Sequence, residues 1–428
     1  METLAYPGVQ ETLYREVMPN GLEVVVLPKE GFSKTYATFS TKYGSVDNRF
    51  AVGGQAPVSV PDGIAHFLEH KMFEEPTGDI FATFASQGAS ANAFTSFDRT
   101  VYLFSATEQI EANLETLIDF VQHPYFTDEN VQKEKGIIEQ EINMYRDNAD
   151  WRVYFGVIDA LYHKHPIHID IAGTVESIYQ IDKETLYRCY ETFYHPSNMF
   201  LFVVGGVKPE TVMKLVRDNQ ARKPFERQGE ITRYFDPEPD TVKIPLKKTT
   251  LPVSMPKVMI GFKERGGASD PEELLRTELT TKLMLEALLG SSSPIYHALY
   301  DDTLITDSFG HEFNSSEDYA FSVVGGESRD PDELLRRLRQ AIEAAQAKGL
   351  DVDTFERTKR KKIGGYLRML NSPEAIASEF TRYRFRGADL FKLLPVYESI
   401  TLDEANARLR SHFNWDRMAV SIVAKEEA

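Results

Sequence analysis

The chain has 428 residues, 42% of them apolar, with a formal net charge of −17 and one cysteine. The acidic charge argues against nucleic acid or an anionic membrane as a partner, and no apolar run is long enough to cross a membrane. Cys189 alone excludes a disulfide within the chain and fits a reducing compartment, and residues 1–8 lack the basic and apolar regions of a signal peptide. We therefore expect a cytoplasmic protein, and its length predicts two or more domains.

The first part of the chain contains alternating strand and helix patterns. Strands are predicted where β-branched and aromatic residues gather, and helices where apolar residues recur at the helical period. In chain order, the predicted elements are strands at 20–28 and 34–44, a helix containing residues 63–70, strands at 89–95 and 100–106, helices at 108–123, 128–147 and 181–194, and a buried strand at 199–206.

The second part of the chain repeats this order. Residues 181–199 echo residues 400–418, and Tyr102-Leu-Phe-Ser echoes Tyr319-Ala-Phe-Ser at nearly the same spacing. The segment 221–249 between the repeats is charged and rich in proline, as expected for a linker. We predict that this linker joins two similar α+β halves, which are residues 1–220 and 250–428.

The most informative pattern is His66-x-x-Glu69-His70. Histidines at this spacing lie on one face of a helix, where both imidazoles can bind one zinc ion. Glu69 can reach the same side and take a proton from a water molecule whose pKa the zinc ion lowers. The motif therefore predicts a zinc hydrolase whose third protein ligand lies elsewhere. The alternative is a helix with two ordinary histidines and a surface glutamate, but the apolar neighbours give this helix a buried side, which argues against it.

Two acidic residues in the predicted helix 128–147 distinguish the halves. Glu134 and Glu141 are two turns apart and share a helix face, whereas Thr358 and Gly365 stand at the corresponding places in the second half. The second half also lacks an H-x-x-E-H motif. Taken alone, the two glutamates would be interpreted as a solvated helix face. We expect the first half to carry the metal and the second half to be a degenerate copy.

These residues resemble the inverted zinc motif of the pitrilysin/insulysin family of zinc metallopeptidases, which includes the mitochondrial processing peptidases. Further segments that match are Asn20-Gly21, Gly44-Ser45, Gly88 to Thr95 and Tyr194 to Met199. The resemblance implies an α+β fold with two homologous halves, each a mainly antiparallel sheet covered by helices, and one Zn²⁺ per chain. By this resemblance, His66, His70 and Glu141 would be the zinc ligands and Glu69 the general base. Glu134 would support catalysis as an outer carboxylate that orients a ligand histidine.

The resemblance also implies a way of binding substrate. Asn92, Ala93 and Phe94 would lie on an edge strand that pairs with the substrate backbone. This mode suits extended, unfolded peptides and distinguishes side chains only weakly. Without the resemblance, Asn92 would be interpreted as an ordinary polar residue of a turn or strand.

In one respect the chain departs from active relatives. Their second half supplies an Arg and a Tyr that help to hold the substrate carbonyl, but residues 298–307 contain no Arg, and neither Thr306 nor Asp307 is Tyr. Stabilisation of this kind contributes roughly 3–4 kcal/mol to catalysis. Either another donor in this chain replaces the pair, or a homologous zinc-less subunit supplies it. The resemblance favours a heterodimer with such a subunit, and a homodimer remains the other arrangement.

Two functions follow from these observations. The first is a zinc endopeptidase that hydrolyses short, unstructured peptides. The second is a non-catalytic scaffold or peptide-binding subunit with a vestigial zinc site. Glu69 discriminates between them, because a structural zinc site does not need a general base.

Overall fold

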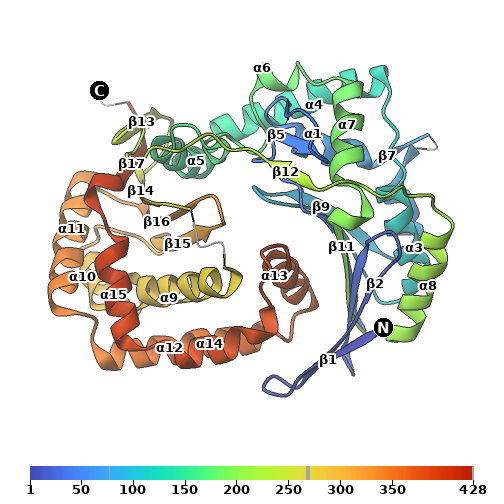
Figure 1. Cartoon of the computed structure of the whole chain (residues 1–428). Coiled ribbons are helices and arrows are strands. Elements are labelled where there is room, and N and C mark those ends of the chain that lie inside the picture. The colour runs from blue at the N-terminus through green and yellow to red at the C-terminus, as the bar shows by residue number, and fades with distance from the viewer. Residues whose placement is uncertain (77, 267–269, 427–428) are drawn as a thin grey trace. The chain divides into compact units, whose positions relative to one another are not determined.

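The computed structural model describes residues 1–76, 78–266 and 270–426, which form two compact units built from discontinuous segments (Figure 1). Unit 1 contains Met1–Ile142, Asp170–Tyr234 and Arg368–Phe385. Unit 2 contains Asn143–Ile169, Phe235–Leu367 and Arg386–Ala428. In the described part of the chain, no helix combines the length and the apolar character needed to span a membrane.

Unit 1 is built on a seven-stranded sheet in the order β1-β2-β3-β11-β4-β10-β9. Strands β3 and β11 are parallel, and the other neighbours are antiparallel. Its strands are β1 (Glu2–Tyr6), β2 (Glu11–Val17), β3 (Glu23–Pro28), β4 (Thr35–Thr41), β9 (Ser90–Thr95), β10 (Thr100–Ala106) and β11 (Met199–Gly205). Smaller sheets are formed by β5 (Arg49–Val52), β6 (Val58–Ser59) and β12 (Ile231–Arg233), and by β7 (Glu74–Glu75) and β8 (Gly78–Asp79).

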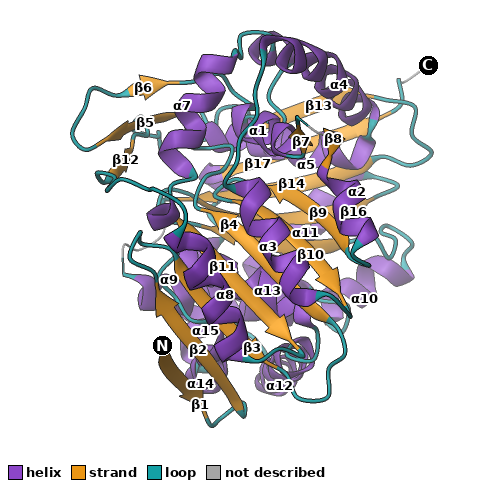
Figure 2. Ribbon diagram, turned by 90° about the vertical axis from the view of Figure 1, so that its right-hand side faces the viewer, coloured by secondary structure: helices purple, strands orange, loops and turns teal. Residues whose placement is uncertain are grey.

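Helices cover both faces of the seven-stranded sheet. The helices of unit 1 are α1 (Ile64–Met72), α2 (Ile80–Ser86), α3 (Ile110–Val121), α4 (Asp128–Asp147, which continues into unit 2), α6 (Val175–Ile178), α7 (Lys183–Phe193), α8 (Pro209–Ala221) and α13 (Pro373–Phe385). Figure 2 shows α3 and α8 in front of the strands, and Figure 1 shows α13 on the other side of the sheet.

The alternation of strand side chains explains why α13 packs there. Every residue of β11 is buried, which requires a covering layer on each face of the sheet. Phe200 and Phe202 point to the same face, where their rings lie 5.8 and 4.7 Å from the ring of Phe380 on α13. The opposite face packs against α3 and α8.

Unit 2 repeats the topology of unit 1. Its five-stranded sheet has the order β13-β17-β14-β16-β15, which reproduces the order β3-β11-β4-β10-β9. The first two strands of each series are parallel and the remaining pairs are antiparallel. The strands are β13 (Leu246–Thr250), β14 (Lys257–Glu264), β15 (Gly310–Ser315), β16 (Ala320–Glu327) and β17 (Met418–Ala424). The predicted α+β fold with two homologous halves is therefore confirmed.

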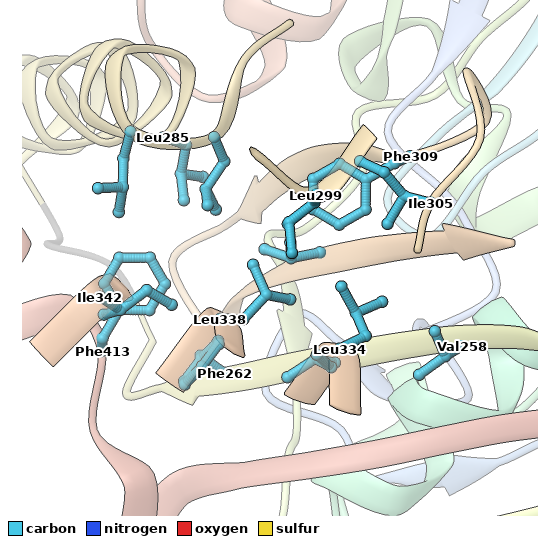
Figure 3. Close-up of a cluster of buried hydrophobic side chains, with 14 of the residues drawn as sticks. Val258, Phe262, Leu285, Leu299, Ile305, Phe309, Leu334, Leu338, Ile342 and Phe413 are labelled. Atoms are coloured by element: carbon cyan, nitrogen blue, oxygen red, sulfur yellow. The ribbon is translucent and has the colours of Figure 1, made fainter. Parts of the chain in front are cut away.

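The core of unit 2 lies between its sheet and a layer of helices. The helices of unit 2 are α5 (Ala149–Leu161), which lies on the opposite face of the sheet from this core, and α9 (Pro271–Leu289), α10 (Pro294–Asp301), α11 (Pro331–Lys348), α12 (Val352–Met369, which ends in unit 1), α14 (Leu393–Ser399) and α15 (Leu402–His412). Figure 3 shows Phe262 of β14, Leu285 of α9 and Leu338 of α11 within this cluster. On the other face of β14, a Cβ at Gly261 would lie 2.8 Å from side-chain atoms of Val157 and Leu161, so glycine permits the close approach of α5.

The predicted linker 221–249 contains regular structure. Strand β12 pairs with β5, and β13 begins at Leu246 and pairs with β17. The compact units also combine segments from both parts of the sequence, because α5 belongs to unit 2 and α13 to unit 1. The predicted ends of the two similar halves, at residues 220 and 250, were drawn from sequence similarity and stay a prediction.

Candidate metal centre

The motif helix α1 begins after Gly63, where the surrounding backbone leaves no room for a side chain. Gly63 is the N-cap residue and has φ of 85°, a conformation that L side chains rarely adopt. A Cβ there would lie 2.4 Å from the carbonyl oxygen of Ala172. Ser177 ties the same turn down by donating a hydrogen bond of 2.8 Å to the carbonyl oxygen of Asp62. These contacts place the first turn of α1, and with it the two histidines that follow.

Three side chains that could bind a metal ion converge in unit 1. His66 and His70 lie one turn apart on α1, and Glu141 comes from α4. Nε2 of His66 is 3.6 Å from Oε1 of Glu141, and Nε2 of His70 is 3.4 Å from Oε2 of the same carboxylate. One ligand atom from each residue can be chosen so that all lie within 4.8 Å of one another. In the described part of the chain, this is the group of His, Cys, Asp and Glu residues that could hold a metal ion.

The spacing and chemistry of these donors fit zinc. Tetrahedral zinc with bonds of about 2.1 Å separates its ligand atoms by about 3.4 Å, which agrees with the two distances from Glu141 to the histidines. Two imidazoles and one carboxylate form a donor set found in catalytic zinc sites, and three protein ligands leave a fourth position open. The residues present therefore fit a catalytic zinc ion.

Glu134 orients one of the histidines from outside. Its Oε1 lies 3.0 Å from Nδ1 of His70, so a proton on Nδ1 makes the hydrogen bond and leaves the lone pair of Nε2 directed at Glu141. Burial lowers the pKa of His70, but the hydrogen bond and charge of Glu134 together with the charges of Glu141 and Glu69 outweigh this, and the pKa lies above its ordinary value. Burial raises the pKa of Glu134, but His70 and Lys71 outweigh it, and the pKa is lowered. The pair thus stabilises the ionised form of each partner.

Glu69 lies beside the predicted ligands and is held by the edge strand. Its side chain is on α1, is 8% exposed as a residue, and accepts a hydrogen bond of 2.5 Å at Oε2 from Oγ1 of Thr95. Thr95 ends β9, the last strand of the seven-stranded sheet. A carboxylate in this position can exchange a proton with a water molecule or with a leaving amine.

The predicted substrate residues lie on the same strand. Asn92, Ala93 and Phe94 pair with Leu103, Tyr102 and Val101 of β10, and the other side of β9 has no neighbouring strand in the described sheet. The backbone N–H of Ala93 donates to Oδ1 of Asn92 at 2.9 Å, so a side chain covers this donor. An edge strand of this kind offers unpaired backbone groups to an extended peptide.

Two contributors to the site were given no role in the sequence analysis. Thr95 holds Glu69, and Lys71 pairs with Glu134 at 3.5 Å while its side chain is completely buried. A lysine inside an otherwise apolar helix surface was the available signal for Lys71, because lysine is almost never fully buried unless it is paired. The alternation of β9 gave a weaker signal for Thr95, which lies two residues from Ala93 and on the same face.

Comparison with known proteins assigns the chain to a family. Residues 58–175 match the family described as Insulinase (Peptidase family M16), and residues 180–362 match the family described as Peptidase M16 inactive domain. A protein of Bacillus subtilis (strain 168), named Uncharacterized zinc protease YmfH, is 51% identical over 421 residues, which cover 98% of each chain. The chain belongs to the M16 peptidase family. This confirms the resemblance drawn from residues 66–70 and 134–141.

Solved structures support the M16 assignment. The crystal structure of an M16-like peptidase from Alicyclobacillus acidocaldarius is 40% identical, with a TM-score of 0.94, and the match covers 97% of this chain and 99% of that one. A protease from Helicobacter pylori shares the fold at 18% identity, with a TM-score of 0.83 over 96% of this chain and 99% of that chain. Relatives named as zinc proteases imply zinc chemistry in the family, and the His66, His70 and Glu141 cluster is where this chain could hold it.

Proposed function

We propose that this M16 chain is a zinc-dependent endopeptidase that hydrolyses short, unstructured peptides. The observation that carries the proposal is the convergence of three donor side chains with a buried carboxylate, Glu69, which a structural zinc site would not need. His66, His70 and Glu141 would hold one Zn²⁺. When bound, this ion supplies Lewis acidity, which lowers the pKa of water and polarises a carbonyl group.

The remaining steps belong to side chains of this chain. Glu69 accepts the proton of the attacking water and passes it to the amine nitrogen as the peptide bond breaks. Thr95 keeps the carboxylate of Glu69 in place through its hydrogen bond. Glu134 keeps His70 in the tautomer whose Nε2 can bind metal.

The substrate lies along β9 as an additional antiparallel or parallel strand. Its backbone pairs with the open side of this edge strand near Asn92, Ala93 and Phe94. Backbone pairing requires an extended peptide, so a folded protein cannot occupy the site without local unfolding. The proposal therefore restricts the substrate class by conformation more than by side-chain identity.

We also propose that a homologous zinc-less subunit completes the enzyme. The support is the sequence of residues 298–307, which contains no Arg and has Thr306 and Asp307 where active relatives lead us to expect a Tyr. A homodimer would carry the same gap at residues 298–307 in both copies.

We place the enzyme in the cytoplasm. The support is its single cysteine, Cys189, which is a buried free thiol.

Hydrolysis of a quenched-fluorescent, unstructured peptide by the zinc-loaded chain tests the proposal. We expect cleavage that a chelator abolishes and added zinc restores, with the homologous subunit, where present, raising the rate. A cyclic form of the same peptide, which cannot extend along β9, should resist cleavage. Cleavage that survives complete removal of zinc would contradict the proposal, and stoichiometric zinc without hydrolysis under any pairing would favour the scaffold function.

A further inference from the structure

Lys71 is a completely buried lysine next to the metal centre. It follows His70 on α1, and its side chain has 0% exposure. Its Nζ forms ion pairs with Glu74 and, at 3.5 Å, with Oε2 of Glu134. The lysine therefore contacts the carboxylate that holds a predicted metal ligand.

The two oxygens of Glu134 have different partners. Oε1 lies 3.0 Å from Nδ1 of His70, while Oε2 faces the ammonium group of Lys71. A carboxylate held at both oxygens cannot rotate without breaking one of these contacts. The position of Lys71 thus limits the orientations open to Glu134, and Glu134 limits those open to the ring of His70.

Stability alone gives no reason for a lysine at this position. Removing an ammonium group from water costs free energy that its ion pairs recover only in part, and an apolar side chain of similar volume is often as stabilising or more so. Leu68 and Met72, which are buried close to Lys71 on α1, are both apolar. The cation is instead placed where the metal centre has an excess of carboxylates, which are Glu69, Glu134 and Glu141.

We propose that Lys71 is a positioning residue that fixes Glu134, and through it His70, in the geometry that binds metal. The inference rests on the proposed zinc function. It assigns Lys71 no contact with substrate or metal. Because Nδ1 of His66 has no hydrogen-bond partner among the described residues, His70 is the ligand through which such an outer contact can act.

The test is the zinc affinity of Lys71→Met, measured by competition with a chromophoric chelator. Methionine has a similar volume but carries no charge. Loss of outer support for a ligand histidine typically weakens metal binding by 10–100-fold, and we expect about 10-fold here. The matched control is Lys135→Met, because Lys135 is 9% exposed on α4 and its Nζ bonds to the carbonyl oxygen of Tyr179 at 3.1 Å, away from the donors. Its zinc affinity should stay within about twofold of wild type.

A double-mutant cycle separates positioning from a general structural effect. If Lys71 acts through Glu134, adding Lys71→Met to Glu134→Gln should weaken zinc binding no further. The visible absorption of bound Co²⁺ should change in Lys71→Met and Glu134→Gln but not in the Lys135 control. Lys71→Arg, which keeps the cation, should restore affinity to within about threefold of wild type.

Lys71→Met alone leaves the carboxylate of Glu134 buried without its cation and can fail to fold. The double variant Lys71→Met with Glu134→Gln removes this carboxylate, so the inference stays testable. Zinc affinity of folded Lys71→Met equal to wild type, or an additional tenfold loss in the Glu134→Gln background, would overturn the positioning role. A wild-type chain that binds no zinc would instead contradict the proposed function. The two failures are therefore distinguishable.

Discussion

Thr95, at the end of the edge strand β9, donates a hydrogen bond of 2.5 Å to Oε2 of Glu69 on the motif helix. The strand proposed to bind substrate and the carboxylate proposed to move protons are thus joined directly. A peptide that pairs with β9 would lie against a strand whose last residue orients the base.

Thr95→Val should lower kcat about 10-fold. A hydrogen bond to a charged group contributes about 1.5–3 kcal/mol, and valine removes it with little change in shape. Steady-state kinetics with the unstructured peptide would measure the loss, and zinc content should stay at wild-type level. Thr95→Ser keeps the hydroxyl and serves as the control. Turnover by Thr95→Val within twofold of wild type would show that Glu69 needs no such support.

Glu141→Gln should weaken zinc binding by more than 10-fold, because an amide oxygen is a poorer zinc ligand than a carboxylate. Glu139→Gln is the matched control on the same helix, since Glu139 accepts a hydrogen bond from Tyr179 at 2.6 Å and faces away from the donors. Chelator competition measures both variants. Equal affinities would mean that Glu141 is not the third ligand.

Gly63→Ala should lower the melting temperature and impair zinc binding. The added Cβ would meet the carbonyl oxygen of Ala172 at 2.4 Å, and φ of 85° is unfavourable for alanine, so we expect a loss of at least about 2 kcal/mol. Gly136→Ala lies within α4 with nothing within 4 Å of its Cβ, and should gain about 0.5–1 kcal/mol of stability from helix propensity. The melting temperature should fall in Gly63→Ala and rise in Gly136→Ala. A change in the same direction in both variants would contradict the argument from backbone conformation.

His165 should make unit 2 less stable as the pH falls from about 6.5 to 4. Burial is the largest cause that lowers its pKa, with His168 and Lys263 acting in the same direction against Glu238, and the pKa falls to about 4. Between these values the unfolded chain binds a proton that the folded chain does not, so protons favour unfolding. This lowering of the pKa of His165 corresponds to a loss of at most roughly 3 kcal/mol in the free energy of unfolding.

The test compares the pH dependence of denaturant unfolding in two asparagine variants. His165 caps the 3-10 helix Pro166–His168 by accepting from Ile167, and His195 caps Pro196–Asn198 by accepting from Ser197. His165→Asn keeps the cap and should flatten the slope between pH 6.5 and 4. His195→Asn, which makes the same substitution at an equivalent cap, is the matched control. An unchanged slope in His165→Asn would assign the pH dependence to other groups.

The sequence predicted the parts of the site that depend on local periodicity. His66 and His70 had to share a face because four residues make about one helical turn, and Glu134 and Glu141 share a face of α4 by the same rule. The repeat of residues 181–199 at 400–418 likewise corresponds to α7 with β11 and to α15 with β17, which occupy equivalent places in the two sheets. These features follow from short stretches of chain.

Features that depend on contacts between distant segments were not predictable. The apolar neighbours of Lys71 on α1 were a signal for its burial, but its pairing with Glu134, far along the chain, is visible only in the structure. No element was predicted at residues 373–385, and the packing of Phe380 against β11 shows that α13 belongs to unit 1. Contacts between distant segments therefore determine which residues surround the predicted metal ligands.

The most direct test of the central claim is to measure zinc content and peptide hydrolysis together in Glu69→Gln. Glu69 is not one of the three predicted zinc ligands, which are His66, His70 and Glu141. The variant should therefore bind one zinc ion with wild-type affinity. Loss of the general base should lower turnover by at least about 100-fold. Hydrolysis by Glu69→Gln at the wild-type rate would contradict the assignment of the base, and loss of zinc from this variant would contradict the assignment of the ligands.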